Sequence, residues 1–190
     1  EASEAETQFV HVKRPTHTNT SWDQARFEIS AHRWIRVGEP GYGVSLANST
    51  TYGHDVTRAV RTDGDRGTTT TVRVSLLRAP RFPDPETDQG VHRFRHALVP
   101  GAGIGDAVRE GWRINVPERT LTGGGEVAPL VTVDREEVVL TALKLADDGS
   151  GDVVVRFHEA HGGRTRVTLT AGFEVADAVA TDLLERPLAD

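Results

Sequence analysis

The 190-residue chain contains no cysteine, no methionine and only two lysines, Lys13 and Lys144. The lack of cysteine excludes disulfide bridges and thiolate sites, and it leaves the redox compartment open. A chain without methionine cannot begin at a start codon, so we expect a fragment or a processed product. Aromatic residues make up 6% of the chain, which is few for a lectin-like platform of exposed rings.

Long apolar runs are also missing from the sequence. No run approaches the roughly 20 residues that span a bilayer. No charged stretch followed by an apolar one opens the chain, as it would in a signal peptide. We therefore expect a cytoplasmic protein that does not bind membranes. The net charge of −6 argues against nucleic-acid binding, which requires a basic surface.

The residues that are present predict short strands. Apolar and polar residues alternate over residues 27–37, 70–77 and 91–99, and this period of two is typical of half-buried strands. Residues 137–145, 152–158 and 164–171 are expected to form three consecutive antiparallel strands joined by glycine-rich turns. About ten strands and no helix predict an all-β sandwich.

Other stretches give weaker signals. Residues 1–7 are acidic and small and are expected to be a frayed lead-in, and residues 108–116 are expected to be a strand. The glycines at 101, 103 and 105 are not expected to bind a dinucleotide, which needs a βαβ unit. Residues 173–190 fit a strand or a helix equally well.

The region between two expected strands, residues 76–100, is the most distinctive in the chain. Three prolines stiffen its loop, because proline lacks an N–H and fixes φ. The loop presents several carboxylates, and Asp84 and Asp88 could be imagined as the two acids of a glycosidase. The alternative is that one of them caps the loop by accepting backbone N–H groups while the other faces water.

Histidine and tryptophan offer further candidates. Four residues of strand separate His92 from His96 by about 13 Å, too far to hold one metal ion together. The three tryptophans, Trp22, Trp34 and Trp112, suggest carbohydrate binding as an alternative function. Trp34 lies on the polar face of its expected strand, so we expect another part of a larger protein to cover it, with a second sheet as the alternative.

Four segments in order resemble one family. They are residues 14–34 (RPTHTNTSWDQARFEISAHRW), 41–56 (GYGVSLANSTTYGHDV), 76–98 (LLRAPRFPDPETDQGVHRFRHAL) and 140–163 (LTALKLADDGSGDVVVRFHEAHGG). Together they resemble the C-terminal region of glycoside hydrolase family 38 α-mannosidases of bacterial type. Four ordered motifs are far more specific than any one of them.

The resemblance implies a fold and a place in a larger enzyme. It implies a large antiparallel β-sandwich of the supersandwich, galactose-mutarotase-like kind, present here as an incomplete piece. Residues 1–190 would form one domain, with the N-terminal catalytic barrel absent. The parent would be a retaining, zinc-dependent hydrolase of terminal α-mannosides. The fragment would pack on the barrel and wall its cleft, without catalytic residues or metal of its own.

The resemblance also suggests which residues reach the substrate. Asp88, Gln89 and His92 would contact the barrel or the sugar, and Arg78 would support the loop. The zinc ion would be bound in the missing catalytic barrel. Two alternatives remain, namely an autonomous carbohydrate-binding sandwich and a purely structural interaction domain.

Overall fold

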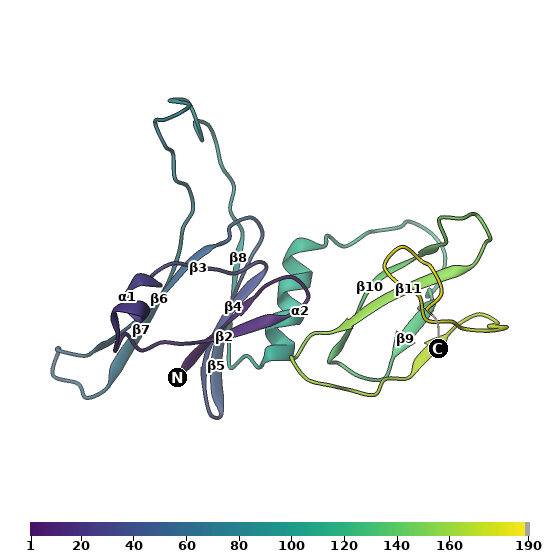
Figure 1. Cartoon of the computed structure of the whole chain (residues 1–190), viewed down its shortest axis with the longest axis horizontal. Helices are drawn as coiled ribbons and strands as arrows, with labels where there is room; N and C mark the ends of the chain where they lie inside the picture. The colour runs from purple at the N-terminus through teal and green to yellow at the C-terminus, as the bar shows by residue number, and fades with distance from the viewer. Residues whose placement is uncertain (189–190) are drawn as a thin grey trace. The chain divides into compact units, whose positions relative to one another are not determined.

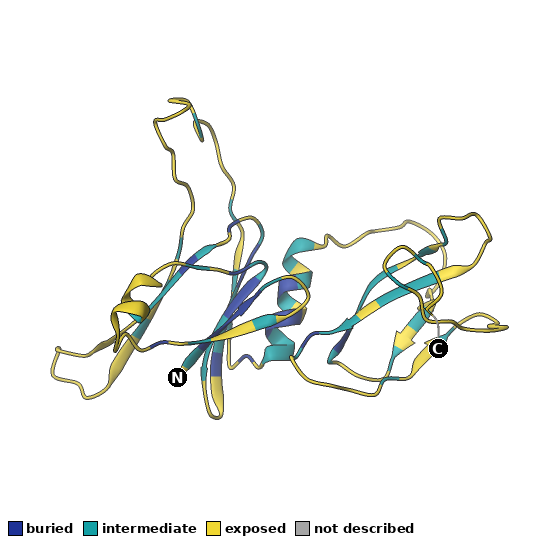
Figure 2. Cartoon of the chain, in the orientation of Figure 1, coloured by how far each residue is buried: buried dark blue, intermediate teal, exposed yellow. Residues whose placement is uncertain are grey.

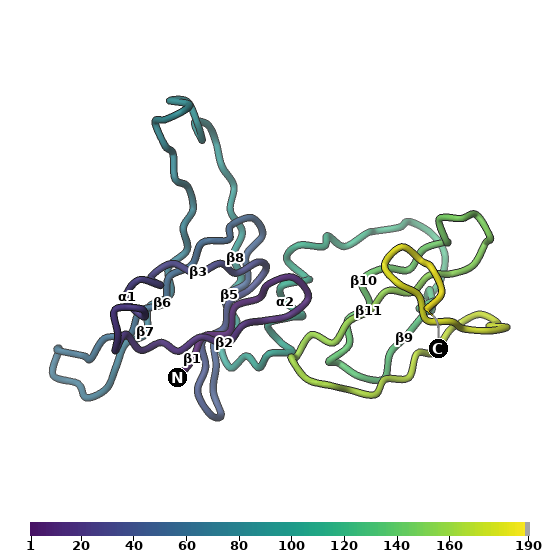
Figure 3. Tube along the Cα trace, viewed as in Figure 1, coloured from purple at the N-terminus to yellow at the C-terminus, as the bar shows by residue number. Residues whose placement is uncertain are grey.

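The computed structural model describes residues 1–188 (Figures 1 and 3). The chain divides into two compact units, Glu1–Arg119 and Thr120–Asp190. The expectation of one domain over residues 1–190 stays a prediction. None of the helices described is long and apolar enough to cross a membrane.

The first unit is a sandwich of two antiparallel sheets with one covering helix. A five-stranded sheet has the order β2-β1-β4-β5-β8, and a three-stranded sheet has the order β3-β6-β7. The bounds are β1 Ala2–Glu6, β2 His11–Pro15, α1 Ser21–Ala25, β3 Ile29–Ser30, β4 Trp34–Glu39, β5 Tyr42–Asn48, β6 Gly53–Val60, β7 Thr68–Val74, β8 His96–Pro100 and α2 Ile104–Asn115.

Strand β1 corrects the expectation of a frayed N-terminal lead-in. It pairs with β2 on one side and β4 on the other, so Ala5 lies between Val12 and Ile35. Four of its five residues are buried. Its polar side chains obscured this in the sequence, because Glu4 and Glu6 are buried only through ion pairs with arginines of the β4 region.

The expected strand over residues 27–37 divides between the two sheets. β3 belongs to the three-stranded sheet and β4 to the five-stranded one. Between the two strands, the N–H of Ala31 donates to the carbonyl of Tyr52, which precedes β6 of the three-stranded sheet. The N–H of His32 donates to the carbonyl of Glu6 in β1 of the five-stranded sheet. The alternation identified Ala31 and Ile35 correctly as core positions, since both are fully buried with Ala5, but Phe27, which shares their parity, is 70% exposed. Figure 2 shows that the buried residues of this unit gather on its strands and on α2.

Helix α2 corrects the expectation of a strand over residues 108–116. Its buried residues are Ala107, Val108 and Gly111, which lie three and four positions apart on one helical face. The N–H of Gly103 donates to Asp106 Oδ2 at 2.9 Å and so begins the helix. The strand before it, β8, pairs antiparallel with β5, whereas a dinucleotide fingerprint needs a parallel βαβ unit.

Helix α2 packs on β4, β5 and β8, and it covers Trp34. The tryptophan is buried on the face of β4 opposite to Ile35. A Cβ atom added to Gly111 would lie only 2.8 Å from Cδ1 of Trp34, so glycine allows the helix to approach the ring. Trp34 is therefore covered by this same chain and not by another part of a larger protein.

Smaller corrections concern strand lengths. β8 begins only at His96, so residues 91–95 belong to the loop and not to the expected strand. β6 was missed, because its apolar residues are few and its outer half is exposed.

The second unit contains two separate antiparallel pairs. β10 pairs with β11, and β12 pairs with β9, so the expected run of three consecutive strands is wrong in its third member. The bounds are β9 Val131–Val133, β10 Val138–Leu145, β11 Val153–Glu159 and β12 Leu169–Ala171. Residues 173–188 are mostly irregular, with one bridge between Thr181 and Pro187, and positions 189–190 of that stretch lie outside the described residues. The all-β class is confirmed.

Candidate functional site

A long loop projects from the first unit between β7 and β8. It comprises residues 75–95 and is drawn as the extended excursion of Figure 1, almost entirely exposed in Figure 2. Phe82 and Val91 are 87% and 93% exposed. A loop with so little apolar burial needs internal bonds to hold a shape.

The loop holds its shape through hydrogen bonds to its own backbone. Asp84 Oδ1 accepts the N–H of Glu86 at 2.9 Å, and Asp88 Oδ2 accepts the N–H of Ala79 at 3.1 Å across the loop. Both aspartates therefore cap backbone groups, where the sequence suggested only one. Gln89 Nε2 donates to the carbonyl of Pro85 at 3.2 Å.

The bond across the loop joins two residues with unusual backbones. Ala79 has φ 42° and Asp88 has φ 59°, the left-handed region that non-glycine residues rarely adopt. Such conformations persist only where surrounding bonds hold them, and they gather at functional sites. These two residues thus indicate that the loop has a defined conformation and is not a flexible linker.

Three of the four predicted site residues lie together in this loop. The ring Nε2 of His92 lies 2.8 Å from the backbone oxygen of Asp88 and therefore donates to it, and in the neutral ring Nδ1 is then an acceptor. Asp88 Oδ1, Gln89 Oε1 and His92 Nδ1 accept no hydrogen bond within the described residues. Three acceptors without such partners suit a ligand rich in hydroxyl donors.

Arg78 lies apart from the other three, at the root of the loop. Its guanidinium reaches Glu28 at 3.4 Å, and Ser75 donates to the same carboxylate at 2.6 Å. The Ser75 hydroxyl, and then Arg78, hold the pKa of Glu28 below its usual value. Arg78 thus anchors one leg of the loop to the three-stranded sheet side.

A pocket of about 310 Å³ lies on the first unit, and the sequence analysis did not predict it. The pocket is lined by residues of β5, of α2 and of three connecting segments, among them His32, Arg33, Asn48, Tyr52, Trp112 and Asn115. The Asn48 carboxamide accepts the N–H groups of Thr50 and Thr51 and donates to the carbonyl of His32 at 2.8 Å. This buried asparagine fixes the pocket wall.

Arg33 forms the charged part of this wall. It makes a bidentate ion pair with Glu6, with a shortest distance of 2.6 Å, and its guanidinium carbon lies 3.9 Å from the ring centre of Trp112. The pairing of arginine with both a carboxylate and an aromatic face fixes its orientation. No pattern of spacing in the sequence joins residues 6, 33 and 112.

The pocket adjoins both legs of the 75–95 loop. The N–H of Ser75 donates to Gly53, next to Tyr52 on the pocket wall. On the other leg, Ser49, which lines the pocket, donates its N–H to Arg95 at 3.2 Å. The pocket therefore lies at the foot of the loop.

The described residues hold no group of three or more histidine, aspartate or glutamate side chains placed to bind a metal ion. His158 lies near the end of β11 and His161 lies in the turn that follows, where Glu159 accepts three backbone N–H groups. The Glu159 carboxylate therefore stabilises the turn through these three hydrogen bonds.

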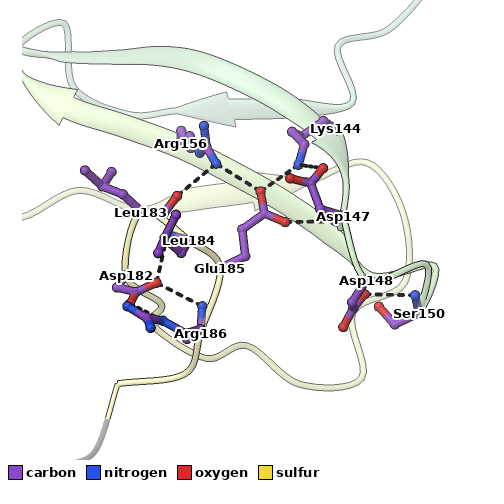
Figure 4. A network of polar contacts seen from close by, with 10 residues as sticks. All are labelled: Lys144, Asp147, Asp148, Ser150, Arg156, Asp182, Leu183, Leu184, Glu185 and Arg186. Atoms are coloured by element: carbon purple, nitrogen blue, oxygen red, sulfur yellow. Dashed lines mark hydrogen bonds and ion pairs between the residues drawn. The ribbon is translucent and has the colours of Figure 1, made fainter.

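The second unit contains a polar network centred on Glu185 (Figure 4). Its carboxylate lies 2.6 Å from Lys144 on β10 and 2.9 Å from Arg156 on β11, and it accepts the N–H of Asp147. The hydrogen bond from Lys144 is the main cause that lowers the pKa of Glu185. The network ties the C-terminal segment to the β10–β11 pair.

Comparison with solved structures shows the fold class first. The chain aligns over 99% of its length with 22% of an α-mannosidase from Enterococcus faecalis V583, with a TM-score of 0.69 and 20% identity. A family 38 glycosyl hydrolase from the same organism gives a TM-score of 0.67 over 99% of this chain and 22% of that one.

Sequence comparison then shows the family. Residues 1–86 match the glycosyl hydrolases family 38 C-terminal domain, and residues 137–190 match the C-terminal β-sandwich domain of the same family. The chain belongs to the C-terminal region of glycosyl hydrolase family 38.

Individual relatives agree with this assignment. The chain is 38% identical to alpha-mannosidase 2C1 of Homo sapiens, over 96% of this chain and 17% of that protein. It is 33% identical to alpha-mannosidase G of Dictyostelium discoideum, over 87% of this chain and 15% of the relative. The chain thus spans about a sixth of the length of the curated relatives it matches.

Proposed function

We propose that this chain is the C-terminal part of a retaining, zinc-dependent α-mannosidase that removes terminal α-mannosyl residues. In this proposal the chain packs on a catalytic barrel, and its 75–95 loop walls the cleft without supplying the nucleophile. The observation that carries the role of the loop is its exposed but internally bonded structure. The family assignment supports the class of enzyme.

The exposed surface supports packing against the rest of a larger protein. The chain has 14334 Å² of accessible surface, whereas a compact protein of 20.7 kDa exposes about 8,900 Å². Two separate globules sharing this mass would expose about 10,700 Å². The excess includes large apolar side chains such as Phe82 and Val91, which another surface would cover.

Zinc does not fit the residues that the structure describes. The described part of the chain lacks a cluster of three ligands, and zinc sites use at least three protein ligands. We therefore assign the metal to the barrel and route no chemical step through it here. A cytoplasmic location is part of the same proposal.

The chemistry of the loop fits contact with a sugar. Asp88 Oδ1, Gln89 Oε1 and His92 Nδ1 are acceptors without partners in the described residues, and a mannosyl residue presents several hydroxyl donors. Rigid placement matters because small displacements of positioning groups weaken catalysis. The Ala79–Asp88 bond supplies that rigidity.

Substitutions of Asp88 in the longer protein test this role. In Asp88→Asn, the side-chain oxygen can still accept the N–H of Ala79, while the outward group becomes a donor. We expect kcat/KM for an α-mannoside to fall at least about tenfold, which is about 1.4 kcal/mol of transition-state stabilisation. His92→Ala should show a similar fall, and the melting temperature should change little in both.

Asp84→Asn is the matched control, because Asp84 caps the same loop and is not assigned to the sugar. It should keep kcat/KM near the wild-type value. Normal kinetics combined with reduced melting temperatures in Asp88→Asn and His92→Ala would show that the loop only supports itself. A longer protein that hydrolyses no α-mannoside would refute the enzyme class.

A further inference from the structure

We propose that the pocket at the foot of the loop binds one neutral saccharide unit of the substrate, beyond the residue that is cleaved. The choice of an α-mannosyl unit rests on the proposed function. The pocket itself selects the broader class, a neutral polyhydroxylated ring, through its charge, its polar groups and its aromatic rim.

The charge of the pocket favours a neutral ligand. Arg33 is the one lysine, arginine, aspartate or glutamate among the residues that line it. Its guanidinium is paired with the Glu6 carboxylate at 2.6 Å, so the positive charge is already compensated. An anionic ligand would have to compete with a carboxylate that is buried beside its partner.

The polar groups of the pocket include a donor and an acceptor without partners. Trp112 lines the pocket, and its buried Nε1–H has no partner among the described residues. Asn115 uses its amide nitrogen to donate to the carbonyls of Asn48 and Gly111 at 2.9 Å, which leaves Oδ1 as an acceptor. Buried polar groups normally find a partner, and a hydroxyl group can serve both a donor and an acceptor.

Two aromatic side chains stand exposed at the rim. Phe9 is 61% exposed and Tyr52 is 62% exposed, and both line the pocket. Rings of this kind combine an apolar face with polar surroundings, which matches the C–H face of a sugar. The ring of Tyr52 meets His32 edge-on with centroids 5.5 Å apart, which fixes its position.

The backbone conformation of Phe9 is a further observation in favour of a ligand at this rim. Phe9 has φ 64° in the turn closed by the bond from the Thr7 N–H to the Val10 carbonyl at 2.8 Å. Glycine is favoured in this conformation, and a bulky residue there is a genuine outlier. A bulky residue in such a backbone conformation at a pocket rim points to a use for its side chain.

The size and place of the pocket agree with this use. About 310 Å³ is at the lower end of volumes seen for small-molecule sites, which suits one sugar ring and not a long chain. Because Ser49 and Gly53 bond both legs of the 75–95 loop, a sugar in the pocket would lie at the root of the proposed cleft wall.

The test uses the longer protein and two substrates. We compare kcat/KM for an α-linked mannotriose with kcat/KM for an aryl α-mannoside, which has a single sugar. Tyr52→Ala and Phe9→Gly should lower the ratio of the two constants about fivefold or more. Phe9→Gly places glycine where the backbone favours it, so loss of folding does not explain the result. Tyr42→Ala is the matched control. Tyr42 is the only other tyrosine of the sequence, is 54% exposed and does not line the pocket. The ratio of the two constants in this variant should equal that of the wild type.

An unchanged ratio in both pocket variants would overturn the inference while the proposed function stands. If the longer protein cleaves neither substrate, the proposed function fails, and saturation-transfer NMR with mannotriose then decides on the pocket. The sugar protons should receive magnetisation from the wild type and from Tyr42→Ala but not from Tyr52→Ala or Phe9→Gly. Equal transfer in all four proteins, or none in any, would refute the site.

Discussion

The histidine at position 54 is buried on β6 and shows how one residue couples stability to pH. Its Nδ1 lies 3.1 Å from the carbonyl of Tyr52, and its Nε2 is buried without a partner in the described residues. Burial is the main cause that lowers the pKa of His54 from 6.5, and nearby His96 lowers it further, while the Tyr52 carbonyl opposes both. The folded protein therefore holds His54 neutral.

We expect the first unit to lose stability as the pH falls below about 6.5. The unfolded chain binds the proton of His54 there and the folded chain does not, so stability falls with decreasing pH until the folded pKa is reached. The slope is at most about 1.4 kcal/mol per pH unit for one proton. Denaturant unfolding between pH 5 and 8 measures it. His54→Asn should flatten this slope whatever its absolute stability, and an equal slope in both proteins would contradict the assignment.

At the scale of elements, Glu185 joins an irregular segment to two strands. Lys144 on β10 and Arg156 on β11 both contact its carboxylate, and Glu185 itself has φ 65°. Such a backbone is held by its bonds and not by local preference. The network therefore fixes where the C-terminal segment meets the β10–β11 pair.

Removing this carboxylate should loosen the second unit at neutral pH only. Because Lys144 and the Asp147 N–H lower the pKa of Glu185, its contribution is complete above about pH 4.5 and is lost as the pH falls through the folded pKa. Glu185→Gln should lower the melting temperature by a few degrees at pH 7, and the difference should shrink toward pH 3. Glu174→Gln, an exposed glutamate of the same unit, is the control. A difference that persists unchanged at pH 3 would show that the charge is irrelevant.

At the scale of the molecule, exposed apolar surface predicts how the isolated chain behaves. Its accessible surface is well above that of two compact globules of its total mass. We expect the 190-residue chain alone to bind a hydrophobic dye or to associate, and the longer protein not to do so. It should also hydrolyse no aryl α-mannoside and retain no stoichiometric zinc after dialysis. A monomeric chain that binds no dye would contradict the expectation of exposed apolar surface. Turnover of the aryl α-mannoside, or bound zinc, would contradict the expectation that the chain alone is inactive and metal-free.

The sequence by itself determined the class of fold, several strands and the family. Alternation located β7, β10, β11 and the core positions Ala31 and Ile35, because a period of two survives wherever one strand face is buried. The three prolines and the cluster of carboxylates also identified a loop within residues 76–100, because they are local features, but the alternation wrongly placed residues 91–95 in a strand. The ordered motifs identified the family, because a motif match depends only on the order of the amino acids.

Tertiary structure decided the rest, because the decisive partners are far apart in the chain. β1 is a central strand only because arginines 27 and 32 positions away pair with Glu6 and Glu4. Helix α2 forms where alternation suggested a strand, because it can bury Ala107, Val108 and Gly111 against β4 and β5. The pocket joins a turn near the start of the chain to α2, and the ring of Trp112 meets Arg33 there. Local periodicity carries no record of such distant contacts, so the loop could be predicted and the pocket at its foot could not.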